Sequence, residues 1–481
     1  MVDQDSQDHR ESSSPAIATL GQLRASGHEY RGVRAELRNN LLTRLRAGQD
    51  PFPGIVGFGQ TVVPHLERAL IAGHDVILLG ERGQGKTRLI RTLVGLLDEW
   101  SPAIEGCEIN DHPYHPTCAR CRRVAGELGD DLPVIWRHAS ERYGEKLATP
   151  DTSVGDLIGD IDPVKVAEGR TLGDPETIHF GLVPRTNRGI FSLNELPDLA
   201  ERIQVSLLNV MEERDIGIRG YALRLPLDLL LVASANPEDY TNRGRIITPL
   251  KDRFGAEIRT HYPLSLADEL TLIGQEAEVT DAELPAHLVE VIARFTRAVR
   301  DSPAVDARSG VSARFAIAAA ESAAASAIRR SALAGQEPVG PAGDPPVARV
   351  CDLPAIVSTL RGKVEFEVSE EGREEEVLNA MLRRAIADTF RSRLGSVDLS
   401  GLLAKFEEGG TVESGELVPA AELLARIGEV PGLAKIMSRL DMIGGESFGH
   451  AAAALEFALE GLYLMRRLSK DSADGTSIYR T

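Results

Sequence analysis

A glycine-rich segment that ends in Lys-Thr has the composition of a phosphate-binding loop. Residues 80–87 read GERGQGKT, which is the pattern G-x-x-x-x-G-K-T. Glycines in this pattern allow successive backbone N–H groups to curl round phosphate oxygens. We expect Lys86 to reach the β- and γ-phosphates of a nucleotide and Thr87 to offer its hydroxyl to Mg²⁺. The glycines concerned are Gly80, Gly83 and Gly85.

The residues on either side of this loop supply the strand and the helix that it requires. Residues 74–79 (HDVILL) are a short apolar run typical of a strand, and residues 88–97 (RLIRTLVGLL) have a helical pattern. The alternative is a glycine-rich turn that contains Lys-Thr by chance, but such a turn would not require a strand before it and a helix after it. The sequence therefore predicts ATP and Mg²⁺ as the ligands of this loop.

A second apolar run ends in two polar residues that could act on the same ligand. Residues 189–196 read GIFSLNEL and predict a buried strand ending at Asn194 and Glu195. We expect Glu195 to orient the water that attacks the γ-phosphate. An Asp usually precedes this carboxylate, and Asn194 brings no negative charge, so weaker Mg²⁺ binding or slower turnover is expected. The alternative is a core strand that merely ends in two polar residues.

Two further residues are candidates because of the segments before them. Residues 229–233 (LLLVA) predict a third strand, which would place Asn236 near the γ-phosphate, although Asn before Pro is also ordinary turn chemistry. Arg253 precedes another strand-like run, and an Arg at such an edge can stabilise transition-state charge on a neighbouring subunit's nucleotide. The alternative for Arg253 is a surface salt bridge with Asp252 or Glu257.

A cluster of Cys and His residues between the first two strands has the ligand types of a zinc site. Cys118 and Cys121 have the C-x₂-C spacing with which two thiolates grip one ion, and Cys107 with His112 or His115 could complete a tetrahedron. A four-iron, four-sulfur cluster and a reduced, metal-free loop are the alternatives. A zinc ion with four protein ligands would hold the loop together and do no chemistry.

The order of the patterns predicts an α/β fold in which strands and helices alternate around a parallel sheet. Apolar runs and helical patterns alternate through the catalytic region, which indicates βαβ units, and the stretch after it is Ala-rich and helical. A Pro- and Gly-rich break then separates a second helical region. The expected organisation is a disordered tail with N-terminal helices (1–50), an αβα P-loop domain (51–262) with the Cys/His insertion (104–124), a helical lid (263–334), a linker (335–351) and a C-terminal helical domain (352–481).

Composition excludes several classes of protein. The 481-residue chain has a formal net charge of −18, which disfavours general nucleic-acid binding, since phosphate backbones are bound by clustered Lys and Arg. No apolar run is long enough to span a bilayer and no secretory leader is evident, so we expect a cytoplasmic protein without a membrane partner. The four cysteines do not resemble a disulfide framework, and Cys351 is expected to be a small packing residue.

Taken together, these motifs make the chain resemble the AAA+ family of ATPases, and within it the magnesium-chelatase I subunits and their MoxR-type relatives. The resemblance rests on the order of GERGQGKT, NRGIFSLNELPDL, LLNVMEERDIGIRGYALRLPLDLLLVASANPED and LKDRFG, and it covers residues 52–330. By resemblance, Lys86 and Thr87 form the Walker A pair and Asn194 and Glu195 the Walker B pair. Asn236 corresponds to the sensor of the γ-phosphate.

The same resemblance implies residues and segments that act between subunits. Arg253 looks like a finger acting in trans, and Arg314, at the start of an Ala-rich helix, looks like the second sensor of the lid. Residues 215–225 resemble the β-hairpin of this clade and residues 152–184 its helix-2 insertion, both of which would line a pore. A ring, usually a hexamer, and a partner with a von Willebrand A domain are implied. Porphyrin chemistry is not implied, because nothing in the sequence indicates a tetrapyrrole site.

Two other functions are compatible with such a motor. A sigma-54-type transcription activator would need a GAFTGA-type loop, which the sequence lacks, and normally a helix-turn-helix, for which the acidic tail is a poor candidate. A nucleotide-gated scaffold with very low turnover is the other, and Asn194 favours it.

Overall fold

The computed structural model describes residues 13–480 except 163, 165–166, 168–176, 213–214, 219–220, 238–244, 307–309, 335–344, 408–409, 443–446 and 474–475. The chain forms two compact units. The first comprises the chain up to Glu81 and Gly85–His261, and the second comprises Arg82–Gln84 and the chain from Tyr262 onward. Residues 1–12, which belong to the expected tail, and residues 335–344 of the expected linker lie outside the described residues.

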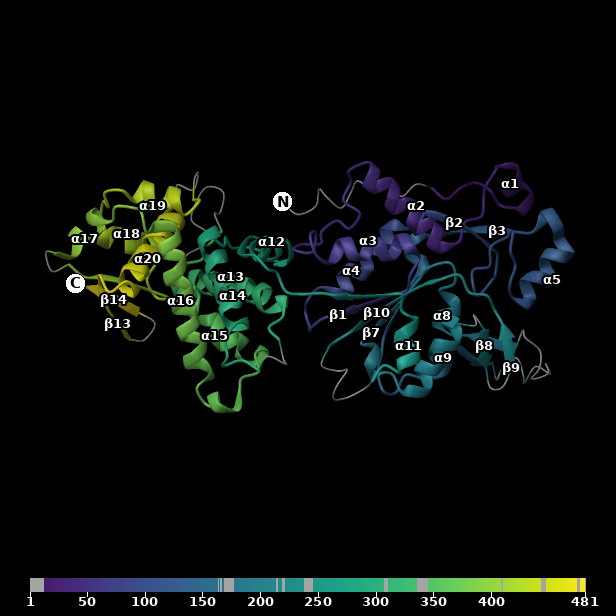
Figure 1. The fold of residues 1–481 in the computed structure, drawn as a ribbon. Helices are drawn as coiled ribbons and strands as arrows, with labels where there is room; N and C mark the ends of the chain where they lie inside the picture. The colour runs from purple at the N-terminus through teal and green to yellow at the C-terminus, as the bar shows by residue number, and fades with distance from the viewer. Residues whose placement is uncertain are drawn as a thin grey trace. The chain divides into compact units, whose positions relative to one another are not determined.

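A five-stranded parallel sheet forms the centre of the first unit (Figure 1). Its strands run in the order β11-β1-β10-β7-β4, and every neighbouring pair is parallel. The predicted α/β fold is therefore confirmed. The strands are β1 (Val76–Leu79), β4 (Tyr143–Leu147), β7 (Ile190–Asn194), β10 (Leu230–Ala235) and β11 (Ala256–Arg259).

Helices cover both faces of this sheet, because each strand directs apolar side chains to both faces. On one face, Val76, Leu78 and Val232 pack against helices α2 (Val33–Arg46), α3 (Val62–Ala72) and α4 (Lys86–Thr92). On the other face, Ile77, Phe191 and Leu231 pack against α9 (Glu201–Glu212) and α11 (Thr248–Arg253). Burial on both faces explains why these strands read as continuous apolar runs and not as alternating patterns.

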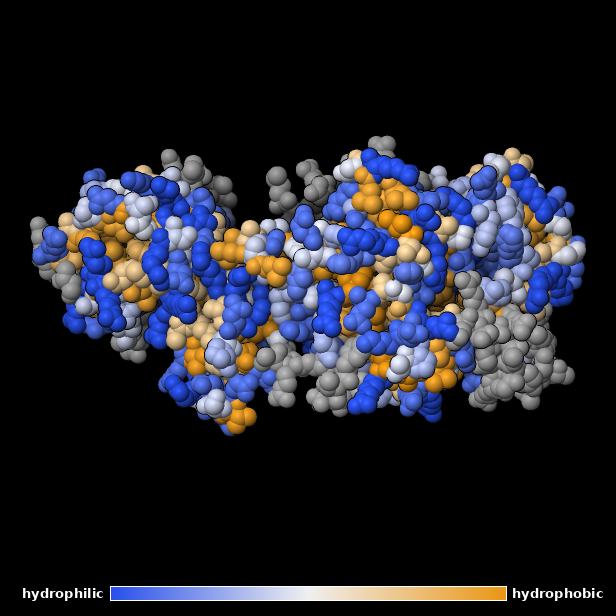
Figure 2. Space-filling view, viewed as in Figure 1, coloured by the Kyte–Doolittle hydropathy of each residue, from blue (hydrophilic) through white to orange (hydrophobic). Residues whose placement is uncertain are grey.

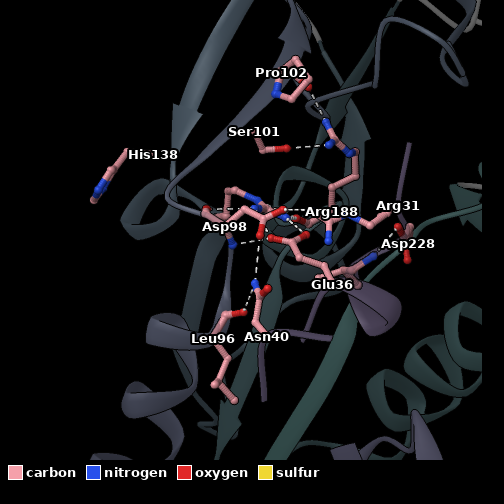
Figure 3. A network of polar contacts seen from close by, with 12 residues as sticks. Arg31, Glu36, Asn40, Leu96, Asp98, Ser101, Pro102, His138, Arg188 and Asp228 are labelled. Carbon is pink, nitrogen blue, oxygen red and sulfur yellow. Dashed lines mark hydrogen bonds and ion pairs between the residues drawn. The ribbon is translucent and has the colours of Figure 1, made fainter. Parts of the chain in front are cut away.

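A buried ion pair between Glu36 and Arg142 ties helix α2 to the segment before β4. Figure 3 shows Glu36 within the surrounding network of polar contacts. The region predicted as one or two helices forms α1 (Leu20–Ala25) and α2. Glu36 of α2 accepts two hydrogen bonds of 2.7 Å from the Arg142 guanidinium, and both side chains are buried. Arg142 also donates to the backbone carbonyl of Arg188, two residues before β7. The N-terminal helices are therefore part of the first unit's core.

Three antiparallel pairs extend from the parallel sheet. Strands β8 (Asp215–Ile218) and β9 (Tyr221–Arg224) form the hairpin that the resemblance implies. Within residues 152–184, β5 (Gly159–Ile161) pairs with β6 (Ile178–Phe180), flanked by α6 (Val154–Leu157) and α8 (Leu182–Arg185). Strands β2 (Trp100–Ile104) and β3 (Val134–His138) enclose the Cys/His loop and helix α5 (Ala119–Leu128).

The second unit is mainly helical and has one continuous hydrophobic core. Helix α13 packs against α14 and α16, and α16 packs against α20. A stripe of buried alanines on α14 allows this close packing. Its helices are α12 (Leu266–Glu276), α13 (Ala286–Arg300), α14 (Ala313–Leu333), α15 (Pro354–Leu360), α16 (Glu374–Leu394), α17 (Ser400–Glu407), α18 (Ala420–Ile427), α19 (Leu433–Arg439) and α20 (Phe448–Leu464).

Two features of the second unit differ from a purely helical domain behind a linker. Strands β12 (Val412–Gly415), β14 (Thr476–Arg480) and β13 (Ser469–Ala473) form an antiparallel sheet. Arg349, within the expected linker, is fully buried and donates to the carbonyl oxygens of Gly415 (2.6 Å) and Val418 (3.0 Å). The end of the expected linker is therefore part of the core.

No helix among the described residues is long and apolar enough to cross a membrane. The face of the molecule seen in Figure 2 is mostly hydrophilic and is interrupted by smaller hydrophobic patches. Large exposed apolar side chains include Leu264, Val368 and Phe448.

Candidate nucleotide-binding site

The three sequence segments predicted to bind or hydrolyse the nucleotide begin where neighbouring strands end. The phosphate-loop segment follows β1, Glu195 follows β7 and Asn236 follows β10. Because these strands are adjacent and parallel, their carboxyl ends lie at one edge of the sheet. The Gly80 N–H continues the ladder with a hydrogen bond of 3.1 Å to the Ala235 carbonyl. The described structure therefore brings these segments to one edge of the sheet.

The loop after β1 has the backbone of a phosphate cradle. Gly85 has a φ of 74° and Gly83 a φ of 73°, both in the left-handed region that favours glycine. Lys86 is 7% exposed, and its ammonium donates to the carbonyl oxygens of Gly80 and Glu81, the latter at 2.8 Å. The loop thus encloses the Lys86 ammonium, which is expected to contact phosphate oxygens. Thr87 is half-buried and is the second residue of α4.

Asn194, the last residue of β7, is fixed by two hydrogen bonds. Its Nδ2 donates to Oε1 of Glu145 over 2.8 Å, and its Oδ1 accepts from the Ser234 hydroxyl over 3.2 Å. The side chain is only 7% exposed. These two partners determine the orientation of the amide, because a carboxylate can only accept from its N–H and the Ser234 hydroxyl donates to its oxygen.

Glu145 is a carboxylate beside the Walker B position that the sequence did not reveal. It lies on β4 and accepts hydrogen bonds from Arg91 (2.9 and 3.1 Å) and from the Tyr143 hydroxyl (2.9 Å). Burial opposes its ionisation, but the hydrogen bonds from Arg91 and Tyr143 and the charge of Arg91 outweigh burial and lower the pKa of Glu145. An ionised carboxylate therefore contacts Asn194, whose own side chain is neutral.

Glu195 has a strained backbone that aims it away from the strand. Its φ and ψ are 55° and 48°, the left-handed region that non-glycine residues rarely adopt. Such a conformation costs about 1–3 kcal/mol and is concentrated at functional sites. The Glu195 N–H donates to the Ser234 hydroxyl oxygen at 3.3 Å, so Ser234 contacts both residues of the expected Walker B pair. Ser234 precedes Asn236 by two residues, and nothing in its sequence context distinguishes it.

The remaining expected residues differ in their exposure. Asn236 is buried directly after β10, whereas Arg253 is exposed at the end of α11. The alternative partner proposed for Arg253, Glu257, lies 3.5 Å from the Lys251 ammonium. Arg314 is exposed at the start of α14 in the second unit.

The Cys/His loop lies apart from these residues, between β2 and α5. Cys107, Cys118 and Cys121 come together there with Asp111, where the sequence predicted His112 or His115. His112 is buried, with one ring nitrogen 3.3 Å from His28 and the other accepting from the Tyr114 N–H at 3.0 Å.

The hydrogen bonds of His112 and the exposed position of His115 explain why neither imidazole joins this group of possible metal ligands. Burial, followed by the charge of Arg188, lowers the pKa of His112 to about 2, so its ring is neutral. Its hydrogen bonds already use both ring nitrogens. His115 is exposed.

Comparison with known proteins agrees with the resemblance found in the motifs. No family model matches the chain. The magnesium-chelatase 38 kDa subunit of Cereibacter sphaeroides is 30% identical over 236 residues, which are 46% of this chain and 62% of that protein. The chloroplastic magnesium-chelatase subunit ChlI-2 of Arabidopsis thaliana is 29% identical over 251 residues, or 51% of this chain and 53% of that protein. Over about half of its length, the chain is similar to magnesium-chelatase I subunits.

The likeness covers only part of each relative. This chain spans a little over half the length of these curated relatives. A solved structure of the complex between subunits BchI and BchD of magnesium chelatase matches 68% of this chain and 98% of that chain, at 20% identity and a TM-score of 0.35. A TM-score this low adds nothing to the sequence match.

Proposed function

We propose that this chain is an AAA+ ATPase that binds and hydrolyses MgATP in a ring and uses the energy to remodel a partner protein complex. The observation that carries the proposal is the meeting of the phosphate loop, Glu195 and Asn236 at the carboxyl edge of one parallel sheet. A Gly-rich turn or a core strand considered alone would not bring all three to one edge.

In the proposed reaction the chain positions the phosphates and the water and supplies no covalent intermediate. Lys86 and the loop N–H groups bind the β- and γ-phosphates, and the Thr87 hydroxyl holds Mg²⁺, which neutralises phosphate charge. Glu195 orients the attacking water and Asn236 contacts the γ-phosphate. The left-handed backbone of Glu195 supports this role, because such strained conformations are concentrated at functional sites.

The proposed active site is completed by a neighbouring subunit. Arg253 is exposed at the end of α11, as a group that reaches into an adjacent subunit must be. We propose a hexamer in which Arg253 acts in trans and Arg314 acts as the sensor of the lid. The β8–β9 hairpin and residues 152–184 would then face the pore.

The proposed partner contains a von Willebrand A domain. Support comes from the sequence relatives, which are subunits of magnesium chelatase and therefore work with other subunits. The proposal excludes general nucleic-acid binding, because the net charge is −18. A cytoplasmic location is supported by the free cysteines, which suit a reducing compartment. Zinc has no role at the nucleotide site.

The experiment that tests this function traps the ATP-bound state. Glu195→Gln should retain ATP without hydrolysing it, so the variant with ATP serves as bait in lysate, with Lys86→Ala as the control that fails to bind nucleotide. Specific ATP-dependent capture of a von Willebrand A protein supports the proposal. Capture of RNA polymerase with its sigma factor would favour the transcription activator instead.

A turnover measurement separates the motor from the scaffold. The native ATPase rate should exceed that of Lys86→Ala by at least about 100-fold. A native rate no higher than the Lys86→Ala background, together with intact ATP binding, would replace the motor with a nucleotide-gated scaffold.

A further inference from the structure

The three cysteines between β2 and α5 form a buried group that the nucleotide chemistry does not use. One sulfur from each of Cys107, Cys118 and Cys121 and one carboxylate oxygen of Asp111 all lie within 4.8 Å of one another. The four residues are between 0% and 8% exposed, and all three thiols are free. Four donors converging on one point is the arrangement of a metal site, and an odd number of thiols cannot be consumed by disulfides.

The backbone around the sulfurs is that of a metal-binding turn. The Cys121 N–H donates to Sγ of Cys118 over 3.3 Å, and the Asp111 N–H donates to Sγ of Cys107 over 3.2 Å. N–H groups directed at sulfur favour the thiolate, which is the form that binds metals.

Asp111 has one acceptor position left after its bonds to the loop. Its Oδ2 accepts from the N–H groups of Thr117 (3.0 Å) and Cys118 (2.8 Å), and its Oδ1 accepts from the Thr117 hydroxyl. A carboxylate offers about four lone-pair positions, so one on Oδ1 is available for a cation. The same bonds hold Asp111 rigidly against the sulfurs.

We propose that this group binds one Zn²⁺ through Sγ of Cys107, Cys118 and Cys121 and Oδ1 of Asp111. Zinc takes four such ligands in a tetrahedron, and bonds of about 2.3 Å give edges of about 3.8 Å, compatible with the observed separations. A four-iron cluster fits less well, since it places its ligands on four separate irons and needs them further apart. With all four positions occupied by protein, the ion is structural.

The proposed ion would stabilise the approach to the Walker B strand. Asn110, within the loop, donates to the carbonyl of Arg185 over 2.8 Å, and Asn187 donates to the carbonyl of Ile109 over 3.0 Å. Residues 185–187 lie directly before β7. A zinc ion that fixes residues 107–121 would therefore fix the segment that leads to Asn194 and Glu195. Zinc binding at this loop does not depend on ATP hydrolysis.

Metal analysis of the full-length chain tests the proposal directly. We expect about one zinc per chain after purification with zinc present, bound tightly enough to survive competition with a chromophoric chelator. Cys118→Ser should lose affinity by more than the roughly 10–100-fold that removal of an outer hydrogen-bond partner costs. Cys351→Ser is the matched control and should retain the metal. Equal weak binding by the native chain and Cys118→Ser would overturn the proposal.

The fourth ligand is tested by conservative substitutions. Asp111→Asn keeps the shape of the side chain and removes its charge, and we expect at least about tenfold weaker zinc binding. His112→Gln and His115→Gln should bind zinc as the native chain does. Loss of zinc in His112→Gln with unchanged binding in Asp111→Asn would overturn the ligand set.

Cobalt substitution keeps the test decisive if cysteine variants fail to fold. Co²⁺ in the native chain should give thiolate-to-cobalt charge-transfer absorption together with the intense visible bands of a tetrahedral ion. Zinc should displace it, with one equivalent per chain sufficient. A weak octahedral spectrum without charge transfer would contradict a three-thiolate site.

Discussion

The Asn194 amide donates a hydrogen bond of 2.8 Å to the Glu145 carboxylate, so the neutral residue at the Walker B position contacts a negative charge from the next strand. Arg91 of α4 donates to the same carboxylate, which joins the helix after the phosphate loop to the end of β7. A carboxylate therefore lies beside the residue at which the resemblance implies an Asp. If Asn194 faces Mg²⁺ as proposed, Glu145 supplies a negative charge that Asn194 lacks.

This pair predicts that Asn194→Asp does not improve the enzyme. The new carboxylate would lie beside ionised Glu145, and like charges at this distance repel and raise each other's pKa. We expect Glu145→Gln to reduce apparent Mg²⁺ affinity by about tenfold or more, because it removes the negative charge beside Asn194. Asn194→Asp should change that affinity by less than about threefold, because the raised pKa leaves the added carboxyl group partly protonated. The double variant restores one charge and one amide, and should lie within about threefold of the native chain. The Mg²⁺ dependence of the ATPase rate measures all four proteins.

The turnover rates of the two single variants show whether Glu145 contributes to Mg²⁺ binding. If Asn194→Asp turned over faster than the native chain and Glu145→Gln were unchanged, the hydrogen bond would be incidental. Glu201→Gln, an exposed change at the start of α9, controls for the loss of a surface charge.

Sequence patterns located the residues that directly follow strands and failed where contacts depend on strand pairing. Lys86, Glu195 and Asn236 could be predicted because each follows an apolar run, and parallel strands end at one edge. Glu145 lies 49 residues before Asn194, and the two meet only through the pairing of β4 with β7. No spacing rule predicts such a contact from one sequence.

The same limit applies to the metal group and to the C-terminal sheet. The C-x₂-C spacing identified Cys118 and Cys121, but Asp111 is a common residue whose role comes from the loop's fold. Strands β13 and β14 are short and mostly polar (SKDSA and TSIYR), so they lack the apolar pattern from which strands are recognised. Both features depend on tertiary structure.

The finger role of Arg253 predicts complementation between two inactive variants. Arg253→Ala lacks the finger but retains its own Glu195, and Glu195→Gln has the reverse defect. If Arg253 acts in trans, random mixing at equal amounts makes about one quarter of the sites complete. Each variant alone should show at least about 100-fold lower ATPase activity, and the mixture should recover a measurable fraction of native activity.

Complementation has a built-in control. Mixing Lys86→Ala with Glu195→Gln should recover nothing, because both defects lie on the same side of the subunit interface. Failure of the Arg253→Ala mixture to recover activity, with mixed rings demonstrated by native mass spectrometry, would place Arg253 outside the shared site.

The buried pair of Glu36 and Arg142 predicts strong dependence of the first unit on its N-terminal helices. Both side chains are 3–5% exposed and share two hydrogen bonds of 2.7 Å. Glu36→Gln leaves a buried guanidinium without its counter-charge, which should cost about 3–5 kcal/mol of unfolding free energy. Chemical denaturation measures the loss.

An exposed pair in the same unit serves as the comparison. Arg24 and Asp130 also form an ion pair, but their side chains are 59% and 66% exposed. Arg24→Ala should therefore change the unfolding free energy by less than about 1 kcal/mol. Similar losses from both substitutions would show that burial does not decide the contribution of these pairs.

His287 predicts acid sensitivity of the second unit. Burial, followed by the nearby charge of Arg393, lowers the pKa of His287 to about 3, and neither ring nitrogen has a hydrogen-bond partner among the described residues. The folded state therefore resists a proton that the unfolded state binds below its pKa of about 6.5, so this contribution to stability is complete above that pH and falls as the pH drops toward 3. Between pH 7 and pH 5 the loss of unfolding free energy is about 2 kcal/mol.

His287→Leu, which packs against Phe457 without titrating, should lack this loss of unfolding free energy. Denaturation curves of both proteins at the two pH values measure the difference, and equal acid destabilisation of the two would show that His287 is not responsible.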